Sequence, residues 1–93
     1  MNEKISIEKT GNENYLVTVE GRQTTVHEVT VKEDDYKRLT GGAVTPEELL
    51  KESFRFLLER ESNTMILRRF DLMVIERYFP EYTSEIKRRL TDE

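Results

Sequence analysis

The spacing of apolar residues changes near residue 32, and this change constrains the fold more than any other feature of the sequence. Before it, apolar and polar residues alternate, as in "YLVTVE" at 15–20 and "TTVHEVTV" at 24–31, and turn-forming residues separate the runs. A period of two is typical of strands that bury one face. Residues 1–32 therefore predict three strands in an antiparallel meander, with one apolar face and one solvent-exposed face.

The alternation also predicts which side chains of the third run share a face. Val29 and Val31 lie on the apolar face, whereas Val26 and Glu28 lie on the other. His27 has the parity of the apolar face, and we expect it at the rim of that face. It is the only histidine of a chain without cysteine, so it lacks neighbours in the sequence for nucleophilic or metal chemistry. We therefore predict a structural or surface role for this residue.

Residues 33–41 predict a short helix and the start of a hinge. The stretch "EDDYKRL" directs Tyr36 and Leu39 inward, and Gly41 is suited to end the helix in a left-handed conformation. The three carboxylates at 33–35 are explained by the positive end of the helix dipole. They lack the alternate spacing, the glycine turn and the distal glutamate of a calcium loop, so they predict no metal site.

The stretch "RLTGGAVTPEELL" at 38–50 has two glycines ahead of a helix, which is one way in which proteins cradle a phosphate. Thr45 is a favourable N-cap, Pro46 suits the first helical position, and Glu48 falls where a capping-box carboxylate belongs. Acidic residues in the first turn would repel a phosphate, and the Lys-Ser/Thr pair of a nucleotide-binding loop is missing. The stretch therefore predicts a hinge at the glycines and a main helix over 45–60.

Two further helical segments are expected after the main helix. Apolar residues over 63–79 fit one continuous helix, or two shorter helices with a break or kink near Asp71. The last helix is predicted over 80–91, with Pro80 at its first position. Its narrow apolar stripe consists of Tyr82, Ile86 and Leu90. The whole chain is thus expected to form one α+β domain, in which three to four helices pack on one face of the meander.

The main helix also predicts a surface for a protein partner. Its apolar residues cover roughly 200° of arc, more than the stripe that a surface helix usually shows. The sheet covers one flank, and the narrow last helix is expected to cover little of the other. Residues that we expect to remain exposed, and to contact a partner or a second copy in a homodimer, are Leu49, Phe56, Leu58, Met65 and Phe79.

Charge and composition limit the classes of function. The chain has 93 residues, with 15 basic and 19 acidic side chains and a net charge of −4. Because these charges are spread along the chain, no overall field favours nucleic acid or an anionic membrane. The N-terminal stretch "MNEKISIEK" is too polar for a signal peptide, and no apolar run approaches the roughly 20 residues of a membrane span. We expect a cytoplasmic protein that uses no cofactor or metal and does not contact a membrane.

Nucleic-acid binding is the alternative function that the sequence offers. Arg68, Arg69 and Arg77 would contact phosphates, and "LMVIERYF" at 72–79 would be the recognition helix of a helix–turn–helix. That helix is largely apolar, and acidic residues interrupt the positive surface around it. Solvated helix faces explain the basic residues better.

The pattern of "TGGAVTPEELL", "FLLERE" and "FDLMVIERYFPEY" resembles a family of small uncharacterised prokaryotic proteins over about residues 26 to 86. The resemblance rests on fold-determining positions and implies no catalytic residues. The order of strands followed by a threonine-capped helix is also similar to HicB-type antitoxins, although their proline- and glycine-rich segment between strands is missing. We therefore expect a small non-catalytic interaction or regulatory module, with a nucleic-acid-binding regulator, antitoxin-like in kind, as the alternative.

Overall fold

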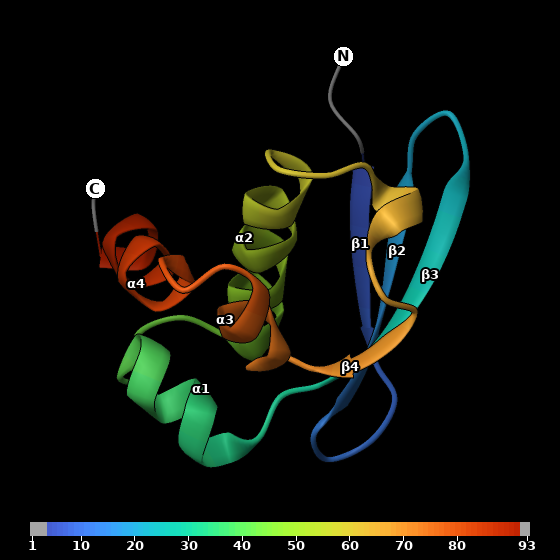
Figure 1. The fold of residues 1–93 in the computed structure, drawn as a ribbon. Coiled ribbons are helices and arrows are strands. Elements are labelled where there is room, and N and C mark those ends of the chain that lie inside the picture. The colour runs from blue at the N-terminus through green and yellow to red at the C-terminus, as the bar shows by residue number, and fades with distance from the viewer. Residues whose placement is uncertain (1–3, 92–93) are drawn as a thin grey trace.

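A computed structural model describes residues 4–91 of the chain and has an α+β fold (Figure 1), which confirms the predicted class. Residues 1–3 of the predicted meander lie outside this part. The strands are β1 (Lys4–Lys9), β2 (Asn14–Glu20), β3 (Thr24–Thr30) and β4 (Arg69–Asp71). The helices are α1 (Glu33–Thr40), α2 (Pro46–Leu58), the 3-10 turn η1 (Asn63–Met65), α3 (Val74–Tyr78) and α4 (Tyr82–Thr91).

The first three strands form the predicted antiparallel meander, and the sheet continues past β3 in the order β1-β2-β3-β4. The register places Ile7 opposite Val17, and Val17 opposite His27. These three side chains face the helices, and both Val17 and His27 are fully buried. Val26, on the other face of β3, is 45% exposed. The sheet therefore has one buried face and one face open to solvent, as the alternation predicts.

The fourth strand shows that the prediction of a helical segment over 63–79 is wrong. β4 runs parallel to β3, with Val29 opposite Phe70. The backbone N–H of Glu28 donates to the carbonyl of Arg68 at 2.7 Å. This pairing satisfies polar backbone groups along the edge of β3 that a helix in this segment would leave without partners. The segment consists of η1, β4 and the short helix α3.

The predicted break near Asp71 is present, but a strand and not a helix precedes it. The Asp71 carboxylate accepts a hydrogen bond from the backbone N–H of Met73 at 3.0 Å, which turns the chain from β4 into α3. The last helix also starts later than predicted, at Tyr82 and not at Pro80. The N–H of Tyr82 first closes a turn to the carbonyl of Phe79 at 2.9 Å, so the proline lies in that turn.

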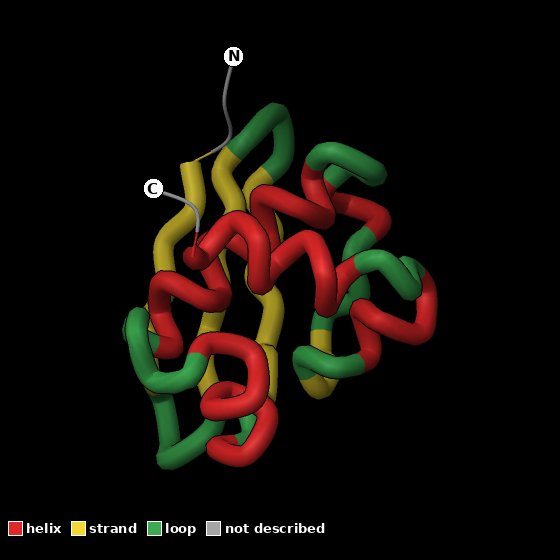
Figure 2. The backbone as a smooth tube through the Cα atoms, turned by 90° about the vertical axis from the view of Figure 1, so that its left-hand side faces the viewer, coloured by secondary structure: helices red, strands yellow, loops and turns green. Residues whose placement is uncertain are grey.

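The four α-helices of the described part lie on the same side of the sheet (Figures 1 and 2). α2 packs against β1 on one side and against α4 on the other. Two-sided packing accounts for the wide apolar arc of α2. The buried hydrophobic residues are Tyr15, Val17, Val19, Val29, Val31, Leu39, Leu49, Leu50, Phe54, Phe56, Leu57, Ile66, Phe70, Leu72, Ile75, Tyr82 and Ile86.

A buried pair of hydroxyl groups joins α2 to α4. The Ser53 hydroxyl donates to the carbonyl of Leu49 at 2.7 Å, so the Tyr82 hydroxyl must donate to Ser53, also at 2.7 Å. Burial raises the pKa of Tyr82 above its usual range, and the phenol stays protonated. This bond holds α4 over α2, so α4 covers part of the surface that α2 was expected to expose.

The glycines between α1 and α2, where the hinge was predicted, adopt left-handed conformations. Gly41 has φ 65° and ends α1, and its N–H donates to the carbonyl of Lys37 at 2.7 Å. Gly42 follows with φ 81°. Residues other than glycine rarely adopt positive φ values of this size.

The main helix begins as predicted, and the contribution of its N-cap to stability can be tested. The Thr45 hydroxyl accepts a hydrogen bond from the N–H of Glu48 at 3.1 Å, and Pro46 occupies the first position. We expect Thr45→Ala to lower the free energy of unfolding by about 1 kcal/mol, because that N–H loses its partner. Urea denaturation measures the change, with Thr10→Ala in an exposed turn as the control. An unchanged midpoint for Thr45→Ala would contradict the role of the cap.

Candidate partner-binding groove

An apolar groove lies between the segment that follows α2 and helix α3. Its cavity volume is about 230 Å³ and it opens to solvent. We call it the groove. Its lining residues are Leu57, Glu61, Met65, Ile66, Leu67, Phe70, Val74, Ile75, Tyr78 and Phe79. The floor is formed by core residues such as Ile66 and Ile75, which are nearly inaccessible to solvent.

Large apolar side chains stand exposed around this groove. Met65 is 70% exposed, Tyr78 is 65% exposed and Leu67 is 46% exposed. Hydrophobic side chains exposed singly are common on soluble proteins, but a group of them around one hollow marks an interaction site. The groove is therefore the strongest candidate site in residues 4–91.

A chain of buried hydrogen bonds holds one wall of the groove against β3. The Asn63 amide donates to the Thr25 hydroxyl at 3.0 Å, and this hydroxyl lies 2.8 Å from Nε2 of His27. Nδ1 of His27 lies 2.7 Å from the carbonyl of Leu67. Because a carbonyl only accepts, Nδ1 carries the proton, and Nε2 accepts from Thr25. The neutral imidazole therefore satisfies every member of the chain, which spans the segment from Asn63 to Leu67.

The burial of His27 corrects the prediction that it lies at the rim of the sheet. Its side chain is fully buried, and its ring centroid lies 5.3 Å from that of Phe54 on α2. Burial lowers the pKa of His27, and the charge of Arg68 adds to this effect, while the bond to the Leu67 carbonyl opposes it. The residue has a structural role, because both ring nitrogens are engaged in positioning the groove.

Glu61 is the only carboxylate among the residues that line the groove. Burial raises the pKa of its carboxyl group. Apart from this group and the hydroxyl of Tyr78, the lining side chains are hydrocarbon or thioether. The groove thus offers an apolar surface with one partly desolvated negative charge.

The residues predicted as a partner surface divide into two groups. Met65 and Phe79 line the groove. Leu49 and Phe56 are fully buried, so their predicted exposure is wrong. Leu58 is half-buried and packs against the core. The expectation failed because α4 covers more of α2 than its narrow stripe suggested.

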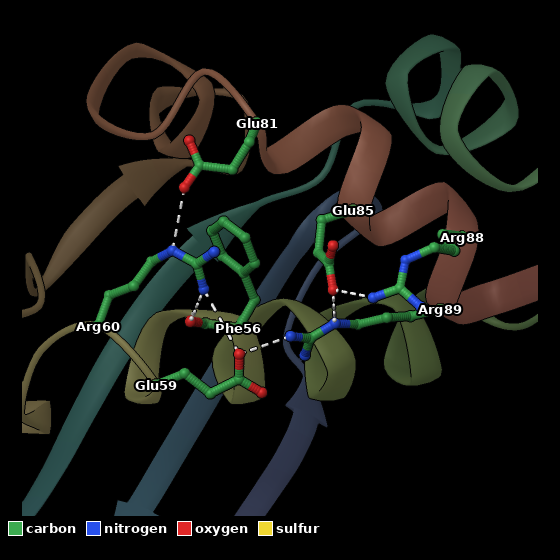
Figure 3. Close-up of polar contacts among 7 residues, drawn as sticks. All are labelled: Phe56, Glu59, Arg60, Glu81, Glu85, Arg88 and Arg89. Atoms are coloured by element: carbon green, nitrogen blue, oxygen red, sulfur yellow. Dashed lines mark hydrogen bonds and ion pairs between the residues drawn. The ribbon is translucent and has the colours of Figure 1, made fainter.

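A cluster of charged residues closes the surface above Phe56 (Figure 3). The Arg60 guanidinium lies 3.7 Å from the centroid of the Phe56 ring, and it pairs with Glu81 at 3.2 Å. Arg89 of α4 pairs with Glu59 at 2.6 Å. Arginine stacked on the face of an aromatic ring shields it from water. This cluster is a structural joint between α2 and α4.

The residues predicted for nucleic-acid contact are all exposed, Arg69 on β4, Arg77 on α3 and Arg68 just before β4. Arg69 pairs with Glu28 at 3.1 Å, whereas Arg68 and Arg77 form no ion pair within residues 4–91. The predicted recognition helix 72–79 is reduced to the five residues of α3. Five residues make about one and a half helical turns.

Leu67 and Tyr78 were not predicted as members of the groove, because residues 63–79 were expected to be helical. A signal for the strand was present in "RRFDL", where Phe70 and Leu72 alternate with charged residues. That run is short, and a period of 3.6 fits its surroundings equally well.

Clusters of possible metal ligands and membrane-spanning helices are both absent from residues 4–91. No three His, Cys, Asp or Glu side chains there lie close enough together to hold a metal ion. None of the helices there combines the length and the apolar character needed to cross a bilayer.

Comparisons with known proteins found no match to the chain among protein-family models, curated proteins or solved structures. The resemblance to the small prokaryotic family and to HicB-type antitoxins therefore stays a prediction. The class that the fold defines is an α+β domain with a mixed four-stranded sheet.

Proposed function

We propose that this chain is a small non-catalytic interaction module whose groove binds an apolar segment of a protein partner. One observation carries the proposal. Of the four large hydrophobic side chains exposed in residues 4–91, Met65, Leu67 and Tyr78 line the groove. Methionine and tyrosine are enriched where proteins bind one another, because both offer a large contact area.

The size and lining of the groove favour a side chain over a metabolite. Its volume of about 230 Å³ is below the range of roughly 300–1,000 Å³ typical of small-molecule sites. Such sites also direct several polar groups at the ligand, whereas Glu61 and the Tyr78 hydroxyl are the polar side-chain groups in this lining. One or two large apolar side chains of a peptide, inserted as anchors, match this description.

Glu61 adds a preference for charge. Its carboxyl group is partly buried and forms no ion pair within residues 4–91. A lysine or arginine beside the anchor of the peptide would stabilise the ionised carboxylate, which burial disfavours. The partner is therefore a segment with large apolar residues and a neighbouring basic residue.

Selection of random peptides on the protein tests this proposal. We expect the selected peptides to carry a large apolar residue next to a basic one, and to bind at least tenfold more weakly to Tyr78→Ser and Met65→Ser, as loss of an interface anchor requires. Glu61→Gln is expected to weaken binding and to reduce its dependence on salt. Fluorescence anisotropy of a labelled peptide measures each affinity.

Val26→Ser is the matched control, because Val26 is an exposed apolar residue on the opposite face of the sheet. It should leave peptide binding unchanged. If the selected peptides bound equally well to the variants at Tyr78 and Met65, the groove would not be the binding site and the proposal would fail.

A further inference from the structure

The first strand of the sheet has a free edge. β1 pairs with β2 and is the terminal strand of the sheet in the order β1-β2-β3-β4. It is the strand at the left-hand border of the sheet in Figure 2. The outer N–H and C=O groups of its six residues therefore have no strand beside them among residues 4–91. A free edge of this kind is a template for pairing with another chain.

The sequence of β1 is complementary to itself in an antiparallel arrangement. If two copies pair about a two-fold axis at Ser6, each Lys4 lies opposite the Glu8 of the other copy, and each Ile5 lies opposite the other Ile7. Opposite charges and β-branched side chains facing each other across strands are both favourable. The two ion pairs form only in this register, and any shift by one residue moves every side chain to the wrong face.

The apolar side chains of β1 are incompletely buried, so a second copy could cover them further. Ile5 and Ile7 face the core side, opposite Val19 and Val17. The two valines are fully buried, whereas the two isoleucines are only partly buried. In the arrangement about Ser6, isoleucines of the two copies meet on this same side and shield one another from water.

We infer that a second copy of this chain pairs with β1, antiparallel and centred on Ser6, and joins the two sheets into one. The interface is isologous, since the same strand serves on both copies. The helices of both copies then lie on the same side of the joined sheet. Lysine at a sheet edge often prevents pairing with other strands, but here the partner strand carries the matching glutamate. This inference goes beyond the groove and does not depend on it.

Disulfide trapping tests the register directly, because the chain has no cysteine of its own. Residues opposite one another in an antiparallel pair have Cα atoms about 4.5–5.5 Å apart, within the range of a disulfide. Ser6→Cys is therefore expected to form a covalent dimer under mild oxidation. Glu8→Cys is the matched control on the same face of the same strand. Its two copies lie about 13 Å apart in this register and should not crosslink.

Equal crosslinking at both positions, or none at Ser6→Cys, would overturn the inference.

A charge exchange provides the second test. Lys4→Glu and Glu8→Lys each turn two attractive pairs into repulsive ones, and each is expected to weaken the dimer about tenfold at low salt. An equimolar mixture of the two variants restores both attractive pairs, so a heterodimer should form with nearly the affinity of the unmodified chain.

Sedimentation equilibrium from low to several hundred micromolar measures these affinities. Lys4→Glu also places a carboxylate opposite Glu20 of β2 in its own chain, so thermal unfolding must show that the variant is folded. Recovery on mixing supports the proposed register. A monomer at every concentration would overturn the inference, and so would variants that dimerise as the unmodified chain does. A dimer lost through Tyr78→Ser but not through the charge changes would move the interface to the groove and overturn it too.

Discussion

Replacing Phe56 with alanine is expected to lower the free energy of unfolding by about 3–5 kcal/mol, the range for a buried aromatic residue that leaves a cavity. Phe56 is fully buried. Its ring centroid lies 5.4 Å from that of Tyr82 and 6.0 Å from that of Phe79, both in edge-to-face geometry. The guanidinium groups of Arg60 and Arg89 lie over the ring, 3.7 Å and 5.7 Å from its centroid. The substitution therefore removes the contact on which α4 and the segment before it pack.

Guanidinium denaturation followed by circular dichroism measures this loss. For a domain of about 90 residues a change of this size lowers the melting temperature by more than 10 °C. Met65→Ala is the control, because Met65 was predicted to share a surface with Phe56 but is 70% exposed; it should change stability by at most about 0.5 kcal/mol. Equal small effects at the two positions would mean that α4 does not cover α2 in solution.

The meander could be predicted from the sequence because its pattern is local. Alternation over Tyr15, Val17 and Val19 determines which side of β2 is buried, and neighbouring strands joined by short turns pair in order. The start of α2 was equally local, since Thr45 and Pro46 act within one turn. Signals of this kind need no information about distant parts of the chain.

The exposed surface of α2 could not be predicted in the same way. The width of its apolar arc correctly indicated packing on two sides, but the identity of the exposed residues depends on α4. Tyr82 and Ile86 are both fully buried, and Arg60 and Arg89 add cover that an apolar pattern does not count. A narrow apolar stripe on α4 was enough because charged side chains complete the joint.

The segment 63–79 was predicted wrongly because its structure is decided by a long-range contact. Phe70 belongs to a strand only because it pairs with Val29. In the chain, α1 and α2 lie between these two residues. The groove depends on the same contact, since Phe70 of β4 lines it together with Leu67 and Tyr78. Without β4 the sequence suggested a helical surface, and the groove was therefore not predicted.

The burial of His27 also depends on a long-range contact, and its replacement is expected to have the second large effect on stability. The face of β3 on which His27 lies was predicted, but its burial depends on Leu67, which is 40 residues away in the sequence. We expect His27→Leu to lower the free energy of unfolding at pH 7 by about 2–4 kcal/mol, because the Thr25 hydroxyl and the Leu67 carbonyl each lose a buried partner. Amide exchange should also become faster across the wall of the groove from Asn63 to Leu67, and peptide binding should weaken.

The pH dependence of stability separates this role from simple loss of packing. The pKa of His27 is lowered in the folded protein from its usual value of 6.5, so the unfolded chain binds the proton more readily. The stabilisation by the neutral ring is therefore complete above pH 6.5 and is lost as the pH falls towards the lowered pKa. Urea denaturation between about pH 7 and 5.5 should therefore show stability falling as the pH falls, and His27→Leu should remove this fall. The raised pKa of Glu61 acts in the opposite direction and keeps its own contribution in the variant. Phe56→Ala, which is similarly destabilised, should retain the fall; if both variants kept it, His27 would not be the group that titrates.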